Sequence, residues 1–395
     1  MAMKFRALLG LLVTMFTMTL AGCGHYVCHT TFGGGTCTPS GGGIGTGPQT
    51  GSPVLFAYFA DDNNGNINAA MLDSAANFNL ISNFTEPTFS PAIDGDMVIV
   101  QDKWLYLSLD SFVILAYSID GASGALSPIG SGQFSNPTSN SFSMTADPAG
   151  HFLFLSGDTT QQIAVFQINQ TDGSLSQTGV FSTGGINAWD ATTDGLGKFL
   201  YVAEGPVGSS AVAAFSIGSN GALTPVAGSP FSFPFAVSQI RGEKSGKFLF
   251  SVAAEVGVNS TPIDNHVYVY SINQTTGAIA QLSGSPFATT YSPYNLVVHP
   301  SGSFLYTFNE NVSGNNSPME GFSIGSNGAL TALAGSPFNN TEPGGMFDQS
   351  GAYFIGHSTG ALDAFSVNTT TGMPTSLSAS AGIGSNFGWA VADPH

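Results

Sequence analysis

The sequence predicts an all-β fold, a seven-bladed β-propeller of four-stranded antiparallel blades, and three observations support this prediction. The stretch Phe215–Phe231 returns 107 residues later as Phe322–Phe338, with only two positions changed. Fainter copies recur about every fifty residues, a period typical of repeat arrays. The repeating part also begins and ends at different points of one repeat unit, which predicts a ring closed by its two ends.

The composition agrees with many short strands joined by tight turns. Charged residues make up only 8% of the chain, while Phe reaches 31 and Gly 51 residues. Aromatic residues favour strands, and glycine favours turns. The net charge of −17 and the lack of a basic stripe argue against nucleic acid as a partner.

The first 22 residues are predicted to be an export signal. Lys4 and Arg6 precede an apolar run, Ala7–Leu20, which is short for a membrane span. The segment ends in Leu20-Ala21-Gly22-Cys23, which resembles the bacterial lipoprotein signal. The resemblance implies cleavage before Cys23 and a lipid anchor on that residue, with several acyl chains giving stable attachment. The alternative is an ordinary cleaved leader with a chance cysteine.

The resemblance also implies an address. We expect an exported, membrane-anchored protein at the outer membrane, in the periplasm or on the cell surface of a bacterium. In a Gram-negative organism, Gly24 after Cys23 favours the outer membrane, because the Asp that retains lipoproteins in the inner membrane is missing.

Residues 23–53 are predicted to form the lipidated cysteine and a flexible tether. Thr38–Pro53 is rich in Gly, Ser, Thr and Pro and has no charge. Cys28 and Cys37 could pair as a disulfide in an oxidising compartment, or remain free thiols. Nearby histidines lack zinc-finger spacing, so a metal site is not favoured there. The propeller itself is predicted over residues 54–395.

The clearest pattern in each repeat is an aromatic-rich strand, followed by a polar loop and another strand. We expect the former to be the second strand of each blade, at Val54–Phe59, Trp104–Leu109, Phe152–Ser156, Phe199–Ala203, Phe248–Val252, Phe304–Phe308 and Tyr353–Gly356. We expect the third strands at Ile67–Leu72, Phe112–Ile119, Ile163–Ile168, Ala211–Ile217, His266–Ile272, Met319–Ile324 and Ala361–Val367.

Turn signals supply the other two strands of each blade. Pairs such as Asp172-Gly173 support hairpins into a short fourth strand. Asp147–Gly150 and His299–Gly302 have Pro and Gly where a type I turn prefers them, directly before the aromatic strand. A first strand is therefore expected before each of these turns, which completes a four-stranded blade.

The two ends of the repeating part predict how the ring closes. Val54–Phe59 has the pattern of a second strand, and Trp389–Pro394 has the pattern of a first strand and its turn. The C-terminal strand is therefore expected to join three N-terminal strands in one blade. In that blade, Leu80–Phe84 is a weak candidate for the fourth strand.

The repeat resembles the seven-bladed lactonase family, which includes bacterial phosphogluconolactonase. The resemblance rests on Asp147–Phe152, Val269–Asn273, Gly221–Leu223 and Gly228–Phe231 and on their copies. It implies a catalytic site of His, Arg and Glu at the mouth of a central channel. Here no His precedes the expected first strands, and Arg241 is the single Arg after the leader. Whether the chain is an enzyme is left open.

Two sets of side chains are predicted to share one face around the channel. The acidic set, from loops between second and third strands, is Asp61, Asp62, Asp110, Asp158, Glu204, Glu255 and Glu310. The aromatic set, from loops into the first strands, is Trp189, Phe235, Tyr291, Tyr294, Phe387 and Trp389. Carboxylates beside aromatic rings could bind a sugar or supply acid and base groups. The favoured alternative is that the acids cap loops and keep the face solvated.

Arg241 is the most specific candidate for a site. It lies within a predicted first strand, aligned with Thr145, Thr192 and Val297 of other blades, where a charge must be paired or near water. It could bind a carboxylate or a lactone carbonyl, with Glu204, Glu255 or Glu310 as weak catalytic partners. The favoured alternative is structural pairing with Glu243 or with an acid of the next blade.

Three histidines receive separate interpretations. His266 and His357 are expected near the same face as candidate ligand contacts, but they lie in separate blades, which argues against a metal site. His299 is expected in a turn on the opposite face. We predict neither a metal nor a cofactor.

Two functions remain in competition. The first is an envelope-anchored binding or scaffold propeller, monomeric, that uses its loop face for a protein or a glycan. The second is an extracytoplasmic hydrolase or isomerase that acts on a neutral lactone or sugar at the central channel.

Overall fold

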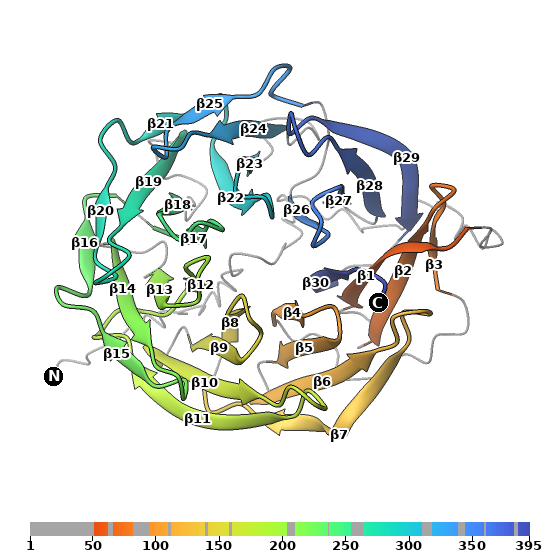
Figure 1. Cartoon of the computed structure of the whole chain (residues 1–395), viewed down its shortest axis with the longest axis horizontal. Coiled ribbons are helices and arrows are strands. Elements are labelled where there is room, and N and C mark those ends of the chain that lie inside the picture. The colour runs from red at the N-terminus through yellow and green to blue at the C-terminus, as the bar shows by residue number, and fades with distance from the viewer. Residues whose placement is uncertain are drawn as a thin grey trace, which may run out of the picture.

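The repeats form a ring of seven β-sheets around a central axis (Figure 1). The structure is a computed structural model, and it describes residues 51–61, 66–81, 95–109, 112–138, 141–157, 160–203, 210–235, 237–253, 264–309, 318–338, 344–358, 361–382 and 386–395. The seven-bladed all-β propeller expected from the repeat is confirmed.

Each sheet is one blade, in which antiparallel strands follow one another from the axis outward. Blade I contains β30, β1, β2 and β3, and blades II to VII follow in chain order. The first strands, next to the axis, are β30 Asn386–Ala392, β4 Met97–Val100, β8 Ser141–Ala146, β12 Asp190–Thr193, β17 Gln239–Gly242, β22 Pro293–Val298 and β26 Gly344–Phe347. The second strands are β1 Pro53–Asp61, β5 Trp104–Leu109, β9 Phe152–Gly157, β13 Phe199–Ala203, β18 Phe248–Val252, β23 Phe304–Asn309 and β27 Tyr353–Ser358.

The outer strands complete the blades. The third strands are β2 Asn66–Asp73, β6 Val113–Ile119, β10 Gln162–Ile168, β14 Ser210–Ile217, β19 His266–Ile272, β24 Met319–Ile324 and β28 Ala361–Val367. The fourth strands are β3 Phe78–Leu80, β7 Leu126–Ser135, β11 Leu175–Ser182, β15 Leu223–Pro225, β20 Ile279–Gln281, β25 Leu330–Ala332 and β29 Pro374–Gly382. In blades IV and V the short strands β16 Phe231–Phe233 and β21 Phe287–Ala288 also pair with the third strand.

The C-terminal strand closes the ring as the sequence predicts. In blade I, β30 pairs antiparallel with β1, with Phe56 opposite Ala392 and Asp61 opposite Asn386. The first strands of all seven blades contact their neighbours around the axis, β30 lying between β26 and β4. Closure leaves no blade at an open end of the ring, where its apolar face would meet water.

Two predicted strands differ from the structure at their ends. The fourth strand of blade I is Phe78–Leu80, earlier than the predicted Leu80–Phe84, and residues from 82 onward lie outside the described part. The third strand of blade II begins at Val113, because Phe112 has a φ of 62° and lies in a turn with its ring exposed. A positive φ cannot continue a strand.

The two ends of the ring have different connections. We call the loop face the side where second strands end and first strands begin. We call the turn face the opposite side, which carries the turns between first and second strands and between third and fourth strands. Antiparallel pairing places all connections of one kind on one face, so the residues in corresponding connections of the seven blades come together.

The core lies between blades. All six residues of β5 are buried, because one side of the strand packs on blade I and the other on blade III. Strands covered on both sides become continuous apolar runs, which explains the aromatic-rich pattern of the second strands. The fourth strands are more exposed and more polar.

At several boundaries between blades, an aromatic ring of one blade packs against a hairpin glycine of the next blade. Gly173, at a φ of 73° in the third-to-fourth-strand hairpin of blade III, lies against Trp104 of blade II, and a Cβ there would be only 2.4 Å from the indole. The Tyr106 hydroxyl donates to the Gly173 carbonyl at 2.6 Å. The same hydrogen bond recurs from Tyr58 to Gly124, from Tyr201 to Gly277 and from Tyr306 to Gly372.

The two nearly identical segments, Phe215–Phe231 and Phe322–Phe338, make the same local hydrogen bond. In the Gly-Ser-Pro-Phe segment, the Ser229 hydroxyl accepts the backbone N–H of Ala214 at 2.8 Å. Ser336 accepts that of Gly321 at 3.0 Å in the copy. In both, the serine precedes a cis proline. The serine therefore satisfies a third-strand donor where the short fourth strand has ended.

Within the described part of the chain, no helix is long and apolar enough to cross a membrane.

Candidate functional site

A row of polar side chains runs around the axis near the loop-face ends of the first strands. Each first strand is the inner edge of its blade, so some of its backbone N–H groups find no partner within the sheet. In blades II to V, a side chain of one first strand accepts such an N–H from the next blade. The pairs are Asp96 Oδ2 with Met144 N at 2.7 Å, Ser143 Oγ with Ala191 N at 3.3 Å, Asp190 Oδ2 with Ile240 N at 2.9 Å, and Gln239 Oε1 with Leu296 N at 3.0 Å.

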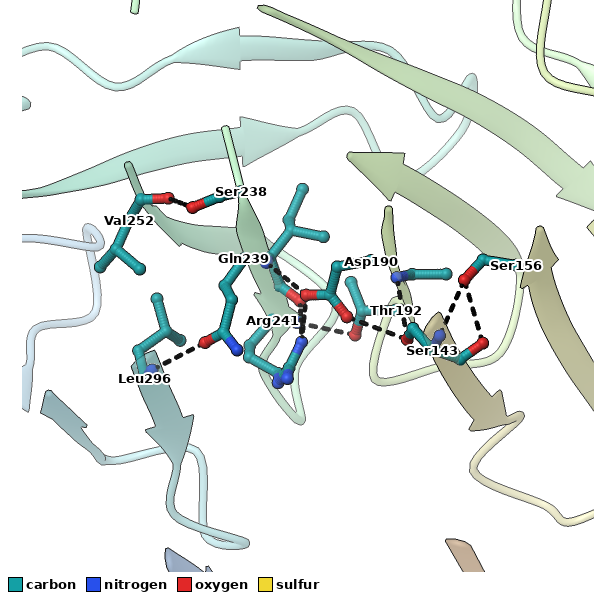
Figure 2. A network of polar contacts seen from close by, with 12 residues as sticks. Ser143, Ser156, Asp190, Thr192, Ser238, Gln239, Arg241, Val252 and Leu296 are labelled. Atoms are coloured by element: carbon teal, nitrogen blue, oxygen red, sulfur yellow. Dashed lines mark hydrogen bonds and ion pairs between the residues drawn. The ribbon is translucent and has the colours of Figure 1, made fainter. Parts of the chain in front are cut away.

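Asp190 is the centre of this row (Figure 2). Its carboxylate accepts from the Ser143 hydroxyl at 3.0 Å on one side, and from Ile240 N and Arg241 Nη1 on the other. The Asp190 side chain is only 2% exposed, whereas that of Arg241 is 29% exposed. The carboxylate therefore joins blades III, IV and V and has little access to solvent.

Arg241 is held by two acceptors. Nη1 lies 2.5 Å from Asp190 Oδ2 and also donates to the Ile240 carbonyl at 2.8 Å. Figure 2 shows the side chain turning back from β17 toward β12. The structural interpretation of Arg241, an ion pair between blades, is the one that this geometry supports.

The partner of Arg241 differs from both acids that the sequence suggested. Glu243 faces its own turn, where it accepts from Lys247 N at 2.8 Å and from the Ser245 hydroxyl at 2.6 Å. The acid that pairs with Arg241 is in the preceding blade. Sequence reasoning missed Asp190, which occupies the same register as Ser143 in the preceding blade.

The aromatic candidates have different degrees of burial. Trp189 is 5% exposed, so its indole is part of the interior. Tyr291, just before β22, and Tyr294, within β22, are both half-buried. The backbone N–H of Tyr291 donates to Glu320 Oε1 at 3.0 Å, which ties the segment before β22 to the third strand β24.

His266 lies at the loop-face end of β19, in contact with a carboxylate. Its Nδ1 is 2.9 Å from Asp264 Oδ1, and the other carboxylate oxygen accepts from the Tyr268 hydroxyl at 2.7 Å. Asp264 and Tyr268 were not among the sequence candidates, since nothing in the repeat distinguishes them.

Several predicted positions fall outside what is described. Cys23, Cys28, Cys37, Asp62, Asp110, Asp158, Glu204, Glu255 and Glu310 are outside the described residues. Asp61, His357, Phe387 and Trp389 are placed in strands β1, β27 and β30, without a description of their side chains.

His299 belongs to the turn face, as predicted from its position before Pro300. It is 1% exposed; its Nδ1 lies 2.8 Å from the Ser301 hydroxyl and its Nε2 lies 2.9 Å from the Gly351 carbonyl in blade VII. Burial lowers the pKa of His299, partly offset by the hydrogen bond to Gly351. The ring is a neutral link between two blades.

A group of acids meets at the turn-face end of the closing strand. The backbone N–H of Asp393 donates to Asp102 Oδ1 at 3.1 Å, and Asp348 is near both carboxyls. Burial, together with the charges of Asp348 and Asp102, raises the pKa of Asp393 to about 6. Burial also raises the pKa of Asp102, although the Asp393 N–H and His395 oppose this.

No group of three or more His, Cys, Asp or Glu side chains that could hold a metal occurs among the described residues. A shallow pocket is present on the turn face between blades V and VI, lined by residues that include Lys244, Lys247, Ser301 and Ile324. It lies at the opposite end of the strands from the row around Asp190, because turns of the turn face form it.

Comparison with known proteins adds family information to this geometry. Residues 104–238 match the family described as "Lactonase, 7-bladed beta-propeller", a match that spans less than half of the chain. Over this stretch the chain is similar to that family. No curated protein matches the sequence.

Solved structures share the fold of this chain. A Bacteroides fragilis protein, provisionally named a 6-phosphogluconolactonase, is 16% identical with a TM-score of 0.66, covering 88% of this chain and 100% of its own. The periplasmic gluconolactonase of Pseudomonas aeruginosa is 14% identical with a TM-score of 0.64, covering 87% of this chain and 100% of its own. At these identities the likeness concerns the fold alone.

Proposed function

We propose that this chain is a binding propeller whose ligand surface is the loop face, and that it is not a lactonase of the central axis. The observation that carries the proposal is the Arg241–Asp190 ion pair between blades IV and V. A catalytic Arg must be able to meet a developing negative charge. Here the guanidinium already neutralises a buried carboxylate, and its withdrawal would leave that charge uncompensated.

The ligand that fits this proposal is a protein or a neutral glycan. The net charge of −17 disfavours phosphorylated sugars and other polyanions. Half-buried aromatic side chains on the loop face, such as Tyr291 and Phe235, provide apolar surface with polar edges, which suits sugar rings and peptide segments.

A second candidate function is lactone hydrolysis at the axis. It is favoured by the family match over residues 104–238 and by the 29% exposure of the Arg241 side chain. The gluconolactonase activity named for the Pseudomonas aeruginosa protein makes neutral lactones the first substrates to test.

The discriminating experiment is lactone hydrolysis by the purified full-length chain, with neutral and acidic lactones, beside Arg241→Ala. We expect no lactone turnover that Arg241→Ala abolishes. Lys103→Ala is the matched control, because it removes a positive charge on a turn of the turn face. Turnover that is lost in Arg241→Ala but kept in Lys103→Ala, with unchanged circular dichroism, would replace the binding proposal with the lactonase.

The binding side of the proposal has its own measurement. A glycan array of neutral and acidic sugars, read with the labelled chain, should show binding to neutral members only. Preference for acidic or phosphorylated members would contradict the role assigned to the charge.

We also propose that the protein is anchored through a lipid on Cys23 and acts in the bacterial envelope, as a monomer. The support is the lipoprotein-like sequence Leu20–Cys23 followed by the uncharged tether. Mass spectrometry of the mature N-terminus tests this: an acylated Cys23 is expected, and a free amine on any other residue would contradict it.

A further inference from the structure

The loop-face end of β19 carries a hydrogen-bonded series of three side chains that the central axis does not use. Asp264 Oδ1 contacts His266 Nδ1 at 2.9 Å, and Asp264 Oδ2 accepts from the Tyr268 hydroxyl at 2.7 Å. His266 and Tyr268 are two residues apart on one strand, so their side chains lie on the same side of blade V. The carboxylate thus bridges an imidazole and a phenol.

The bridge fixes the protonation of the imidazole. A carboxylate only accepts hydrogen bonds, so the proton of neutral His266 is on Nδ1 and the lone pair is on Nε2. The His266 side chain is 37% exposed, whereas Asp264 is 22% exposed. Of the two side chains, the imidazole is therefore the one more open to solvent.

The surroundings hold this arrangement in place. The Ser292 hydroxyl donates to the Asp264 carbonyl at 3.0 Å, and the Thr289 N–H donates to the Asn265 carbonyl at 2.8 Å. These bonds join the segment before β19 to the segment before β22. An orienting group that is itself fixed is what a general base requires.

Aromatic rings form an apolar wall beside the series. The ring of Phe235 stacks on Tyr268, with centroids 3.6 Å apart and planes at 16°, and Phe233 stacks on Phe235 at 5.8 Å. Both phenylalanines are half-buried, so part of the wall is open to solvent. It suits a small uncharged molecule with an apolar portion.

We propose that Asp264, His266 and Tyr268 form a water-activating site that hydrolyses small neutral open-chain carboxylic esters. His266 Nε2 takes a proton from water while the water oxygen bonds to the ester carbonyl carbon. The carbon–oxygen bond to the alcohol then breaks, and the imidazolium gives the same proton to the leaving oxygen, yielding acid and alcohol. Asp264 and Tyr268 are positioning residues.

The site shares the Phe235 ring with the proposed binding surface but lies apart from the residues of the axis. Its activity requires neither Arg241 nor Asp190, so the two hypotheses fail separately. Arg241→Ala should leave ester hydrolysis unchanged.

The test is hydrolysis of p-nitrophenyl acetate and p-nitrophenyl butyrate by the full-length chain. We expect His266→Gln to lower kcat/KM about 100-fold, in the range that one general base contributes. His151→Gln is the matched control, since the His151 side chain is 57% exposed and its Nδ1 is 3.9 Å from Asp147. Equal losses of kcat/KM in the two variants would mean that any exposed imidazole catalyses the reaction, and this would overturn the proposal. An unchanged kcat/KM in His266→Gln would also overturn it.

The positioning residues need a measurement that a loss of stability would not imitate. We expect Asp264→Asn and Tyr268→Phe to lower kcat and leave KM unchanged. Nitrogen NMR of the imidazole should show the Nδ1-protonated form of His266 in the native chain and a mixture of forms in Asp264→Asn. An Nε2-protonated His266 in the native chain would overturn the proposal, even if His266→Gln failed to fold.

Discussion

At the scale of single residues, Asp190 matters because its removal would leave several hydrogen-bond donors without an acceptor. Its carboxylate is 2% exposed and accepts from Ser143, Ile240 and Arg241. The charge is stable in the interior only with these donors. Three blades therefore depend on one side chain.

Replacement of Asp190 should cost more stability than replacement of Arg241. Asp190→Ala leaves a backbone N–H, a hydroxyl and a guanidinium without their acceptor, at a cost of roughly 3 kcal/mol. Arg241→Ala leaves the buried carboxylate with two neutral donors, but the Arg241 side chain is 29% exposed, so water can enter the space it leaves and we expect a smaller loss of about 2 kcal/mol. Urea unfolding followed by fluorescence measures both. A larger loss for Arg241→Ala would contradict the assignment of Asp190 as the centre of the row.

The sequence predicted Arg241 but not its partner, for a physical reason. A lone Arg within a strand pattern is conspicuous, because a charge there needs a partner. Asp190 looked like one more polar residue next to a strand, and only the closed ring brings it beside the next blade. The same holds for Asp264, whose contacts with His266 and Tyr268 depend on backbone geometry just before β19.

At the scale of strands and turns, tyrosines of the second strands connect neighbouring blades. Tyr106 donates to Gly173 across the boundary between blades II and III. Phe154 and Phe250 occupy the same position in blades III and V, so a ring without a hydroxyl also fits there. The hydroxyl is therefore an addition to the packing of the ring.

Tyr106→Phe should lower the free energy of unfolding by about 1 kcal/mol, because the buried Gly173 carbonyl loses its donor while the ring remains. The same change at Tyr201, whose hydrogen bond to Gly277 is 3.0 Å long, should have a similar effect. Thermal and urea unfolding of each single variant and of the double variant measure the two losses. Additive losses are expected, because the residues lie at different boundaries. If neither variant were less stable than the native protein, these hydrogen bonds would not contribute to the stability of the fold.

The turn where the ring closes should make stability depend on pH. The pKa of Asp393 is raised to about 6 in the folded protein, against 3.8 ordinarily. The folded state thus binds more protons than the unfolded state between about pH 4 and pH 6, so the free energy of unfolding falls as the pH rises through this range. Asp73, whose buried carboxyl has its pKa lowered to about 2 by hydrogen bonds from Asn77, Ala75 and Gly51, acts below this range and with the opposite sign.

Asp393→Asn isolates this effect. The variant should show a flatter dependence of stability between pH 4 and pH 6, measured as urea midpoints at constant ionic strength. A control, Asp172→Asn, changes an exposed hairpin acid whose pKa is lowered by Ser174, and should leave the slope in that range unchanged. If the urea midpoint changed with pH equally in the native and Asp393→Asn proteins, the Asp393 carboxyl would not be the group that binds the extra proton in the folded state.

At the scale of the whole molecule, the predictable part of the fold was the repeat and its closure. The 107-residue copy and the two unlike ends determined the number of blades and the role of the C-terminal strand. Exact strand ends were less predictable. Phe112 looked like a strand residue, but its positive φ belongs to a turn that its own side chain does not reveal.

Removal of Asn386–His395 tests the closure directly. The truncated chain would leave blade I with three strands and expose the inner edge of β1, along which β30 pairs from Phe56 to Asp61. Open edges pair with other molecules. We expect a lower thermal midpoint and soluble oligomers by size-exclusion chromatography with light scattering. A monomer with the native midpoint would show that the ring does not need its last strand.

The closing blade also gives the molecule an orientation. β1 begins at Pro53 on the turn face, beside the end of β30. A protein held at a membrane through residues before 53 would stand on its turn face. His266 and the loop-face aromatic side chains would then face away from the membrane, while the acids around Asp393 would lie on the side of the lipid headgroups.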